Sequence, residues 1–126
     1  MMKGAPKMNP DEMKSRTKEF AKEIVKLCRK LPNNLEGRLI GNQAFKSGTS
    51  IAANYRAACR GRSKAEFVSK LGIVLEEGDE TLFWLELIWE MDICRENVVP
   101  SLMKECDEIV AIVVSSIKTA KQDKRV

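Results

Sequence analysis

Basic side chains gather in the middle of the chain in a pattern that suits phosphate recognition. Arg56, Arg60, Arg62 and Lys64 follow one another closely, and Arg38 stands eighteen residues before Arg56. On a helix, residues four apart share a face and eighteen residues make five turns, so Arg38, Arg56 and Arg60 are predicted to share one stripe. The planar guanidinium group binds two phosphate oxygens at once, and such cations supply much of the affinity for nucleic acid. These five residues are therefore the candidate contact site for RNA or DNA.

Two other interpretations of this basic cluster remain open. The same side chains would also suit ion pairs with an acidic helix of a neighbouring subunit, or a plain solvated surface. Tyr55 lies beside the cluster, but it falls on the apolar face of its predicted helix. It is therefore not expected to stack on bases, as aromatic residues do in proteins that bind single strands.

A second set of charged residues, all carboxylates, falls in the segment predicted as the third helix. Such clusters can bind hard metal ions or act as general acid and base, but these residues spread around the helix without the spacing of a calcium loop. A solvated or ion-paired face is therefore the expected role. Glu76 and Glu80 are like charges one turn apart, which favours a cationic partner such as the basic second helix of another subunit. The carboxylates of this segment are Glu76, Glu77, Asp79, Glu80, Glu86 and Glu90.

The tryptophans of the third segment raise the question of a subunit interface. Trp89 fits the predicted core, whereas Trp84 stands next to the core position Leu85 and points elsewhere. Tryptophan is enriched at interfaces, so Trp84 is grouped with Glu76 and Glu80 as a candidate subunit interface. Burial or partial burial of Trp84 within the monomer is the alternative.

No catalytic or metal chemistry is predicted for this chain. It contains no histidine, which excludes His-ligated zinc, Ser-His-Asp triads and the histidine-containing di-iron motif of helical bundles. Its four cysteines form no C-x-x-C pair and have no evident basic partner, so buried or half-buried free thiols are expected. There is also no Gly-rich phosphate loop. We expect a protein without enzymatic activity and without a cofactor.

Four helices must position these residues. Amphipathic periodicity and capping signals predict helices over residues 10–31, 35–60, 64–91 and 99–120. Asn9, Asn33 and Ser63 are the expected N-caps, each with a glutamate three residues later, and Pro32 ends the first helix. Short connections between such helices favour an up-down-up-down four-helix bundle, with a single domain over residues 1–126. The predicted fold class is all-α.

One apolar seam on each helix is expected to build the core. Gly48, in the second helix, suggests that another helix approaches closely there, and the small residues of that seam favour self-association. The predicted seam of the first helix is Met13, Thr17, Phe20, Ile24, Leu27 and Leu31. The predicted seam of the third helix is Phe67, Leu71, Val74, Gly78, Leu82, Leu85 and Trp89.

Charge is distributed unevenly along the chain. Residues 1–63 hold 14 Lys/Arg against 5 Asp/Glu, and residues 64–126 hold 8 against 13, which together give the net charge of +4. Such asymmetry is a physical basis for partner binding or assembly. Residues 1–6 lack the apolar core of a signal peptide, and the best uncharged apolar run, residues 109–117, is too short to span a membrane. We therefore expect a cytoplasmic protein with no membrane partner.

The stretch from Gly41 to Leu87 resembles the family called four-helix bundle protein. The resemblance rests on SIAANYRAA at residues 50–58, RGRSKAEF at 60–67, KLGIV at 70–74 and EEGDETLFWLEL at 76–87. The family includes bacterial proteins encoded within intervening sequences of ribosomal RNA genes, and the accessory protein of diversity-generating retroelements is similar to them. The resemblance implies a four-helix subunit that closes into a ring, commonly a pentamer, with a basic surface in the retroelement members.

Together these observations predict a non-enzymatic, homo-oligomeric helical protein that associates with nucleic acid through a basic surface. The expected partners are further copies of the chain, with a pentamer favoured, RNA or DNA, and a reverse transcriptase or another nucleic-acid enzyme. The alternative is a structural or protein–protein scaffold whose charged faces serve only self-assembly.

Overall fold

Four helices make up most of the chain that the structure describes, residues 9–122 of a computed structural model. They are α1 (Pro10–Lys30), α2 (Leu35–Cys59), α3 (Lys64–Glu90) and α4 (Val98–Gln122). No strand occurs within residues 9–122, so the prediction of an all-α chain with four helices is confirmed. The helix ends differ from the predicted bounds by no more than two residues. Residues 1–6, on which the absence of a signal peptide was predicted, lie outside the described part.

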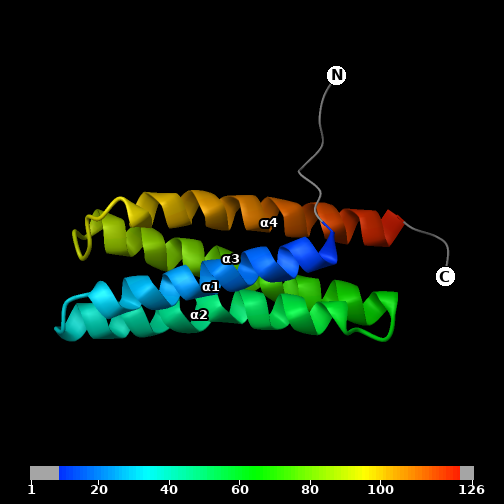
Figure 1. Ribbon diagram of the computed structural model, residues 1–126, viewed down its shortest axis with the longest axis horizontal. Coiled ribbons are helices and arrows are strands. Elements are labelled where there is room, and N and C mark those ends of the chain that lie inside the picture. The colour runs from blue at the N-terminus through cyan, green and yellow to red at the C-terminus, as the bar shows by residue number, and fades with distance from the viewer. Residues whose placement is uncertain (1–8, 123–126) are drawn as a thin grey trace, which may run out of the picture.

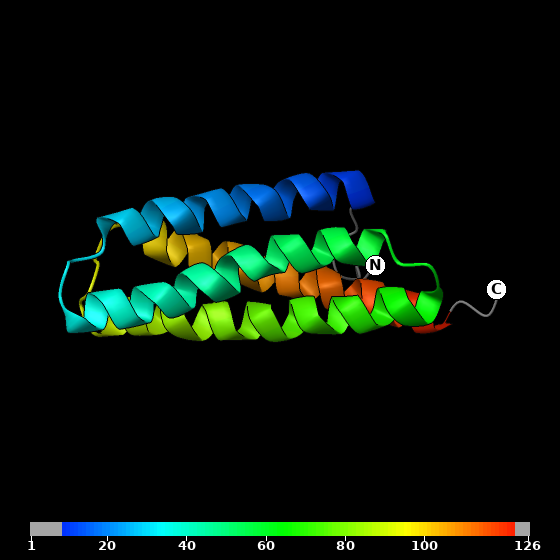
Figure 2. The ribbon, with the colours of Figure 1, turned by 90° about the horizontal axis from the view of Figure 1, so that it is seen from below.

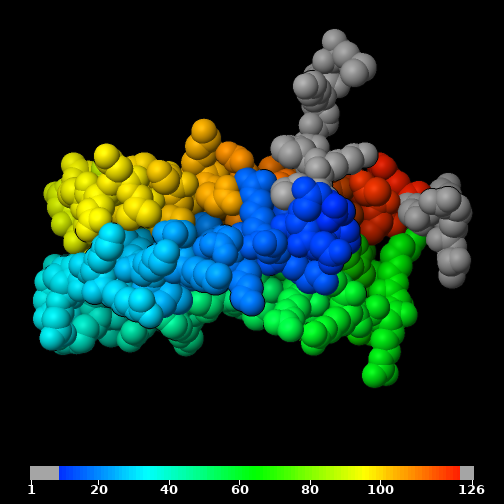
Figure 3. All heavy atoms as spheres, viewed as in Figure 1, coloured from blue at the N-terminus to red at the C-terminus, as the bar shows by residue number. Residues whose placement is uncertain are grey.

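Consecutive helices run in opposite directions and form an elongated bundle (Figures 1 and 2). α2 packs against both α1 and α3, and α3 also packs against α4, whereas α1 touches α4 much less extensively. The space-filling view shows α1 lying across the face between α4 and α2 (Figure 3). The turn between α2 and α3 lies at the same end of the bundle as the start of α1 and the end of α4, which are the two ends of the described chain (Figure 1). None of the four helices is long and apolar enough to cross a membrane.

Side-chain caps fix where the first three helices begin. Asn9 and Glu12 form a full capping box, in which the Asn9 Oδ1 atom accepts a 2.8 Å hydrogen bond from the Glu12 amide. Ser63 accepts from the backbone amide three residues later, at 3.1 Å, and so caps α3. The cap of α2 is Asn34 rather than the predicted Asn33, because the Asn34 Oδ1 atom accepts a 2.8 Å bond from the amide three residues later. Asn33 and Asn34 have identical side chains, so the sequence pattern placed the N-cap one residue too early.

The core follows a seven-residue repeat, as in coiled coils. The predicted seam of α1 is buried from Met13 to Leu27, and this part of the prediction is confirmed. Alternating steps of three and four residues keep one stripe of each helix turned inward, which is the packing of left-handed four-helix bundles. In α2 the repeat is met by Gly37, Gly41, Ala44, Gly48, Ile51, Tyr55 and Ala58.

The seam of α3 differs from the prediction at its start, where Phe67 is only half-buried, and in its second half. Thr81 and Ile88 are buried, whereas the predicted Leu82 and Trp89 are only half-buried beside the core. A threonine can occupy a core position here because its Oγ1 atom donates a 2.7 Å hydrogen bond to the backbone carbonyl of Glu77, four residues earlier. The buried positions of α3 are Leu71, Val74, Gly78, Thr81, Leu85 and Ile88.

Two glycines allow neighbouring helices to approach closely. A Cβ atom at Gly48 would lie 2.9 Å from the Cγ1 and Cγ2 atoms of Ile24 on α1. A Cβ atom at Gly78 would lie 2.6 Å from the Cγ2 atom of Val110 on α4. The close approach predicted from Gly48 is therefore made with α1 of the same chain. The small residues of α2 are used within the bundle, so they lend no support to self-association.

The four cysteines are free thiols. Cys94 and Cys106 are buried, and Cys28 and Cys59 are half-buried. Burial raises the pKa of Cys28 to about 11 and that of Cys106 to about 12. Both thiols therefore remain protonated near neutral pH, and a protonated thiol is a poor nucleophile.

We predict opposite effects of Gly→Ala substitution at two helical positions. At Gly72 nothing lies within 4 Å of an added Cβ, so Gly72→Ala should raise the free energy of unfolding by about 0.5–1 kcal/mol through helix propensity. At Gly48 the new methyl group collides with Ile24, and overpacking costs about 1–3 kcal/mol, which exceeds the propensity gain. Urea unfolding followed by circular dichroism measures both. A Gly48→Ala variant as stable as Gly72→Ala would show that α1 and α2 do not approach closely.

Candidate nucleic-acid interface

The structure brings four of the five predicted basic residues together at one end of the bundle. Arg56 lies in the last turn of α2, Arg60 is the C-cap residue, and Arg62 and Lys64 follow in the turn and at the start of α3. Arg38 shares the α2 stripe of Arg56, but the rise of a helix places it about 27 Å away. Arg38 therefore lies at the opposite end of the bundle and is not part of this cluster.

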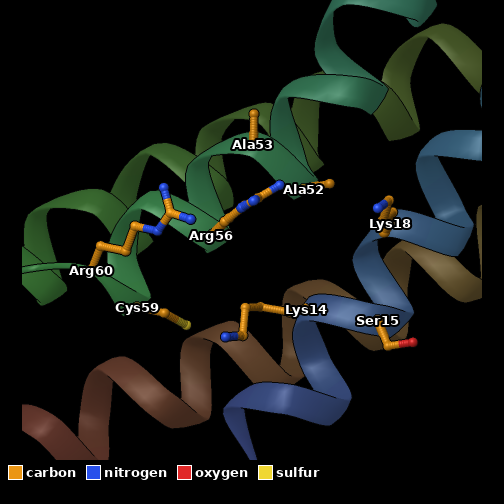
Figure 4. Close-up of a pocket in the computed structure, with 8 residues that line it drawn as sticks. All are labelled: Lys14, Ser15, Lys18, Ala52, Ala53, Arg56, Cys59 and Arg60. Carbon is orange, nitrogen blue, oxygen red and sulfur yellow. The ribbon is translucent and has the colours of Figure 1, made fainter.

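A groove between α1 and α2 runs along this cluster, with a volume of about 530 Å³. Figure 4 shows Lys14 and Lys18 on α1 facing Arg56 and Arg60 on α2. The two lysines were not predicted as site residues, because they are more than thirty residues away in sequence and only the packing of α1 on α2 brings them here. The groove is lined by Lys14, Ser15, Lys18, Ala52, Ala53, Arg56, Cys59 and Arg60.

A second groove, of about 460 Å³, lies on the other side of α2, against α3. Arg56 and Arg60 line both grooves, so they stand on the ridge that separates them. This groove adds Arg62 and Lys70 to the cationic surface, and Glu66 is the one carboxylate among its lining residues. The α2–α3 groove is lined by Ala53, Arg56, Ala57, Arg60, Arg62, Glu66 and Lys70.

Small residues keep both grooves open. Ala53 lines the two grooves, Ala52 lies on the α1 side and Ala57 on the α3 side. A larger side chain at these positions would fill the space between the cationic groups. The alanines of the SIAANYRAA stretch thus leave space beside the long side chains of Arg56 and Arg60 in both grooves.

The cations around the grooves differ in their pairing from those elsewhere on α1. Lys22 and Lys26 pair with Glu19 and Glu23, one turn earlier, at 3.0 and 3.4 Å. Lys18 has Ser15 at the corresponding position and no carboxylate within 4 Å in the described chain. The other groove cations without a carboxylate partner in residues 9–122 are Arg56, Arg60, Arg62 and Lys70.

These groups form a cluster of like charges with little internal compensation. Lys14 is the exception in the α1–α2 groove, because it pairs with Asp11 at 3.2 Å. Uncompensated cations repel one another, and a bound anion relieves that repulsion. The arrangement can therefore bind phosphate groups.

Tyr55 takes no part in this surface. It is 4 % exposed and belongs to the core, as the sequence predicts. Burial raises its pKa above the ordinary value, and the neighbouring Cys59 contributes. The phenol ring therefore cannot serve as a stacking platform for bases.

The candidate interface residues of α3 lie on a different part of the molecule. Trp84 is half-buried, and its Nε1 atom donates a 3.1 Å hydrogen bond to Glu80. Phe83 packs edge-on against Trp84 with ring centroids 4.9 Å apart. Glu76 is exposed on the same side of α3, and burial together with the charges of Glu80 and Glu76 raises the pKa of Glu77. Within residues 9–122 no three Cys, Asp or Glu side chains gather closely enough to hold a metal ion.

Exposed apolar residues lie beside Trp84 on α3 and at the same level on α2. Phe83 is 50 % exposed, and Leu39 on α2 is 56 % exposed. Leu39 lies twenty residues before the end of α2 and Trp84 twenty residues after the start of α3, so the antiparallel pair places them at the same level. We call this region the apolar patch. Its members are Leu35, Leu39, Phe83, Trp84 and Met91.

Fold and surface together define a small four-helix bundle protein with cationic grooves at one end. The chain belongs to the 23S rRNA-intervening sequence protein family, whose sequence model matches residues 11–115. The family predicted from the sequence is therefore confirmed.

A solved structure is similar in fold and in sequence to most of this chain. It is the crystal structure of a protein of unknown function from the S23 ribosomal protein family of Bacteroides thetaiotaomicron. The two sequences are 36% identical, the match covers 88% of this chain and 99% of that one, and the TM-score is 0.81. A comparison with curated proteins found no match.

We predict that Arg16 stabilises the fold through its ion pairs, whereas Arg60 does not. Arg16 on α1 binds Glu105 through two hydrogen bonds of 2.7 Å and Glu108 through one of 2.8 Å, all on α4. Arg16→Ala should lower the free energy of unfolding by about 1 kcal/mol, since the network is bidentate but partly exposed. Arg60→Ala should leave the melting temperature unchanged or raise it slightly at low salt, because it removes a repulsive charge. A large loss of stability for Arg60→Ala would instead indicate that Arg60 makes ion pairs between subunits.

Proposed function

We propose that this protein is a non-enzymatic, nucleic-acid-binding protein that acts through the cationic grooves. The observation that carries the proposal is that cations from α1, α2 and α3, most of them without a carboxylate partner in residues 9–122, converge around two grooves lined by alanines. Arginine and lysine placed in this way neutralise phosphates and release the counterions condensed on a nucleic acid. No array of base-reading side chains accompanies them, so binding is sequence-independent.

The family supports this assignment. The family takes its name from intervening sequences of 23S rRNA, which associates its members with ribosomal RNA genes. The resemblance to the accessory protein of diversity-generating retroelements supports a nucleic-acid enzyme, such as a reverse transcriptase, as a partner. RNA and DNA share the phosphodiester backbone, and the grooves would accept either.

Self-association is the second part of the proposal, with a pentameric ring as the favoured form. The apolar patch supports it, because exposed leucine and aromatic side chains of this kind are typical of interface cores. The patch and the grooves lie at opposite ends of the α2–α3 hairpin, so subunits that meet through the patch leave the cations free. Five copies with a net charge of +4 each would carry +20. Weak phosphate contacts multiply when several subunits engage one polymer.

Nucleic-acid binding is tested by removing three arginines together. The triple substitution Arg56→Ala, Arg60→Ala and Arg62→Ala should weaken binding of a single-stranded oligonucleotide more than tenfold. It should also lower the slope of log K against log salt by about 2, since each single-strand phosphate contact contributes roughly 0.7. Mobility shift or fluorescence anisotropy at about 50 to 200 mM salt measures both.

A charge-matched control separates a site from general electrostatics. Lys22, Lys26 and Arg29 are three cations on α1 outside both grooves, and their substitution by Ala removes the same charge. This control should bind nearly as the wild type does. Absence of binding by the wild-type protein to RNA and DNA at about 50 mM salt would favour the scaffold alternative.

The assembly is tested at the apolar patch. Leu39→Lys combined with Phe83→Glu should dissociate the oligomer, because both side chains lose apolar area and two charges enter the patch. Native mass spectrometry at micromolar concentration should show a pentamer for the wild type and smaller species for the variant. A wild-type monomer at low and moderate salt alike would contradict the proposal, and dissociation by the arginine triple variant would place those arginines in the subunit interface.

A further inference from the structure

The two grooves meet at one ridge, and this arrangement restricts how a nucleic acid can lie on the protein. We propose that a single-stranded nucleic acid crosses α2 from the α1–α2 groove to the α2–α3 groove, so that its backbone contacts Lys18 on one side and Lys70 on the other. This inference rests on the proposed function. It adds the direction in which the nucleic acid crosses the protein, the two contact residues Lys18 and Lys70, and a preference for single strands over duplexes.

The direction follows from where the cations are. Arg56 and Arg60 stand on the α2 ridge, Lys18 lies across the first groove and Lys70 across the second. These four residues come from three neighbouring helices at one level of the bundle. A path along α2 would instead lead past the exposed Lys46, ten residues before Arg56, to Arg38, about 27 Å away by the helical rise. Neither of these residues lines either of the two grooves.

Strandedness follows from the shape of the surface. Phosphates must enter one groove, pass over a ridge one helix wide, about 10 Å, and enter the next. A flexible single strand can follow this relief, whereas duplex DNA stays straight over about 50 nm. α2 also cannot enter a major groove about 12 Å wide, because α1 and α3 flank it at normal packing distances of about 8–10 Å.

The ridge itself favours contact with the backbone over contact with bases. Ala53 and Ala57 leave room for a strand to approach α2 closely. Two aromatic residues are nearby in sequence. Tyr55 is buried and cannot stack, and the half-buried Phe67 packs against the core and lines neither groove. Binding should therefore tolerate any base and depend on the phosphodiester backbone that RNA and DNA share.

Four single variants test the path. Lys18→Ala and Lys70→Gln should each lower the salt slope for an unstructured oligonucleotide of about 20 residues by roughly 0.7 and weaken binding several-fold. Two matched controls should leave both quantities unchanged. Lys22→Ala removes a lysine one turn from Lys18 that is paired with Glu19, and Arg38→Ala removes the distant arginine of the same α2 stripe.

Cys59 provides a readout that does not depend on charge. Its half-buried thiol lines the α1–α2 groove, whereas the half-buried Cys28 contacts the Gly41 carbonyl outside this groove. An oligonucleotide in the groove should slow alkylation of Cys59 and leave that of Cys28 unchanged, as measured by mass spectrometry. Poly-dT and poly-rU oligonucleotides distinguish DNA from RNA, and a duplex of equal length tests strandedness.

The outcomes separate this path from the proposed function. Loss of binding in the arginine triple variant, with no effect of Lys18→Ala or Lys70→Gln and no protection of Cys59, would overturn the path and leave the function standing. Equal effects of Arg38→Ala and Lys18→Ala would overturn the transverse direction. Tighter binding of duplex than of single strands would overturn the strandedness. Absence of binding to every nucleic acid would overturn both proposals.

Discussion

The seven-residue repeat of buried positions is the constraint on which the rest of the structure depends. Because each helix turns one narrow stripe inward, the remaining positions are free of packing requirements. On α2 the inward stripe is made largely of small residues, and Gly48 lets α1 come against it at van der Waals distance. This close approach fixes the α1–α2 groove, because α1 and α2 form its two walls. The two helices cannot separate without exposing Ile24 to solvent.

The sequence predicted best what is decided locally. The ends of the helices follow from caps and prolines, and the seam of α1 is a clean amphipathic pattern from Met13 to Leu27. After Gly78 the predicted α3 seam is correct at Leu85 but wrong at Leu82. The sequence pattern treats Thr81 as polar, although a hydroxyl that donates to its own helix backbone can be buried. The cap of α2 was misplaced by one residue for a similar reason, since Asn33 and Asn34 are chemically equivalent.

The candidate site could be predicted only in part, because its residues come from three helices. Arg56 and Arg60 are one turn apart, so the helical period alone places them together. Lys18 and Lys70 join them only through packing, which no local pattern encodes. Arg38 shows the converse: the helical period puts it on the correct stripe, but the helical rise over eighteen residues places it about 27 Å from Arg56.

The two ends of the described chain lie beside the turn that joins α2 to α3 (Figure 1). Any domain attached before Asn9 or after Gln122 would therefore be tethered next to the cationic grooves. A short flexible tether holds its cargo at an effective concentration in the millimolar range. Such a fusion would make the bundle an adaptor that brings an attached enzyme to a polyanion. A basic purification tag at either terminus would add its own affinity for polyanions next to the grooves, so it should be removed before binding is measured.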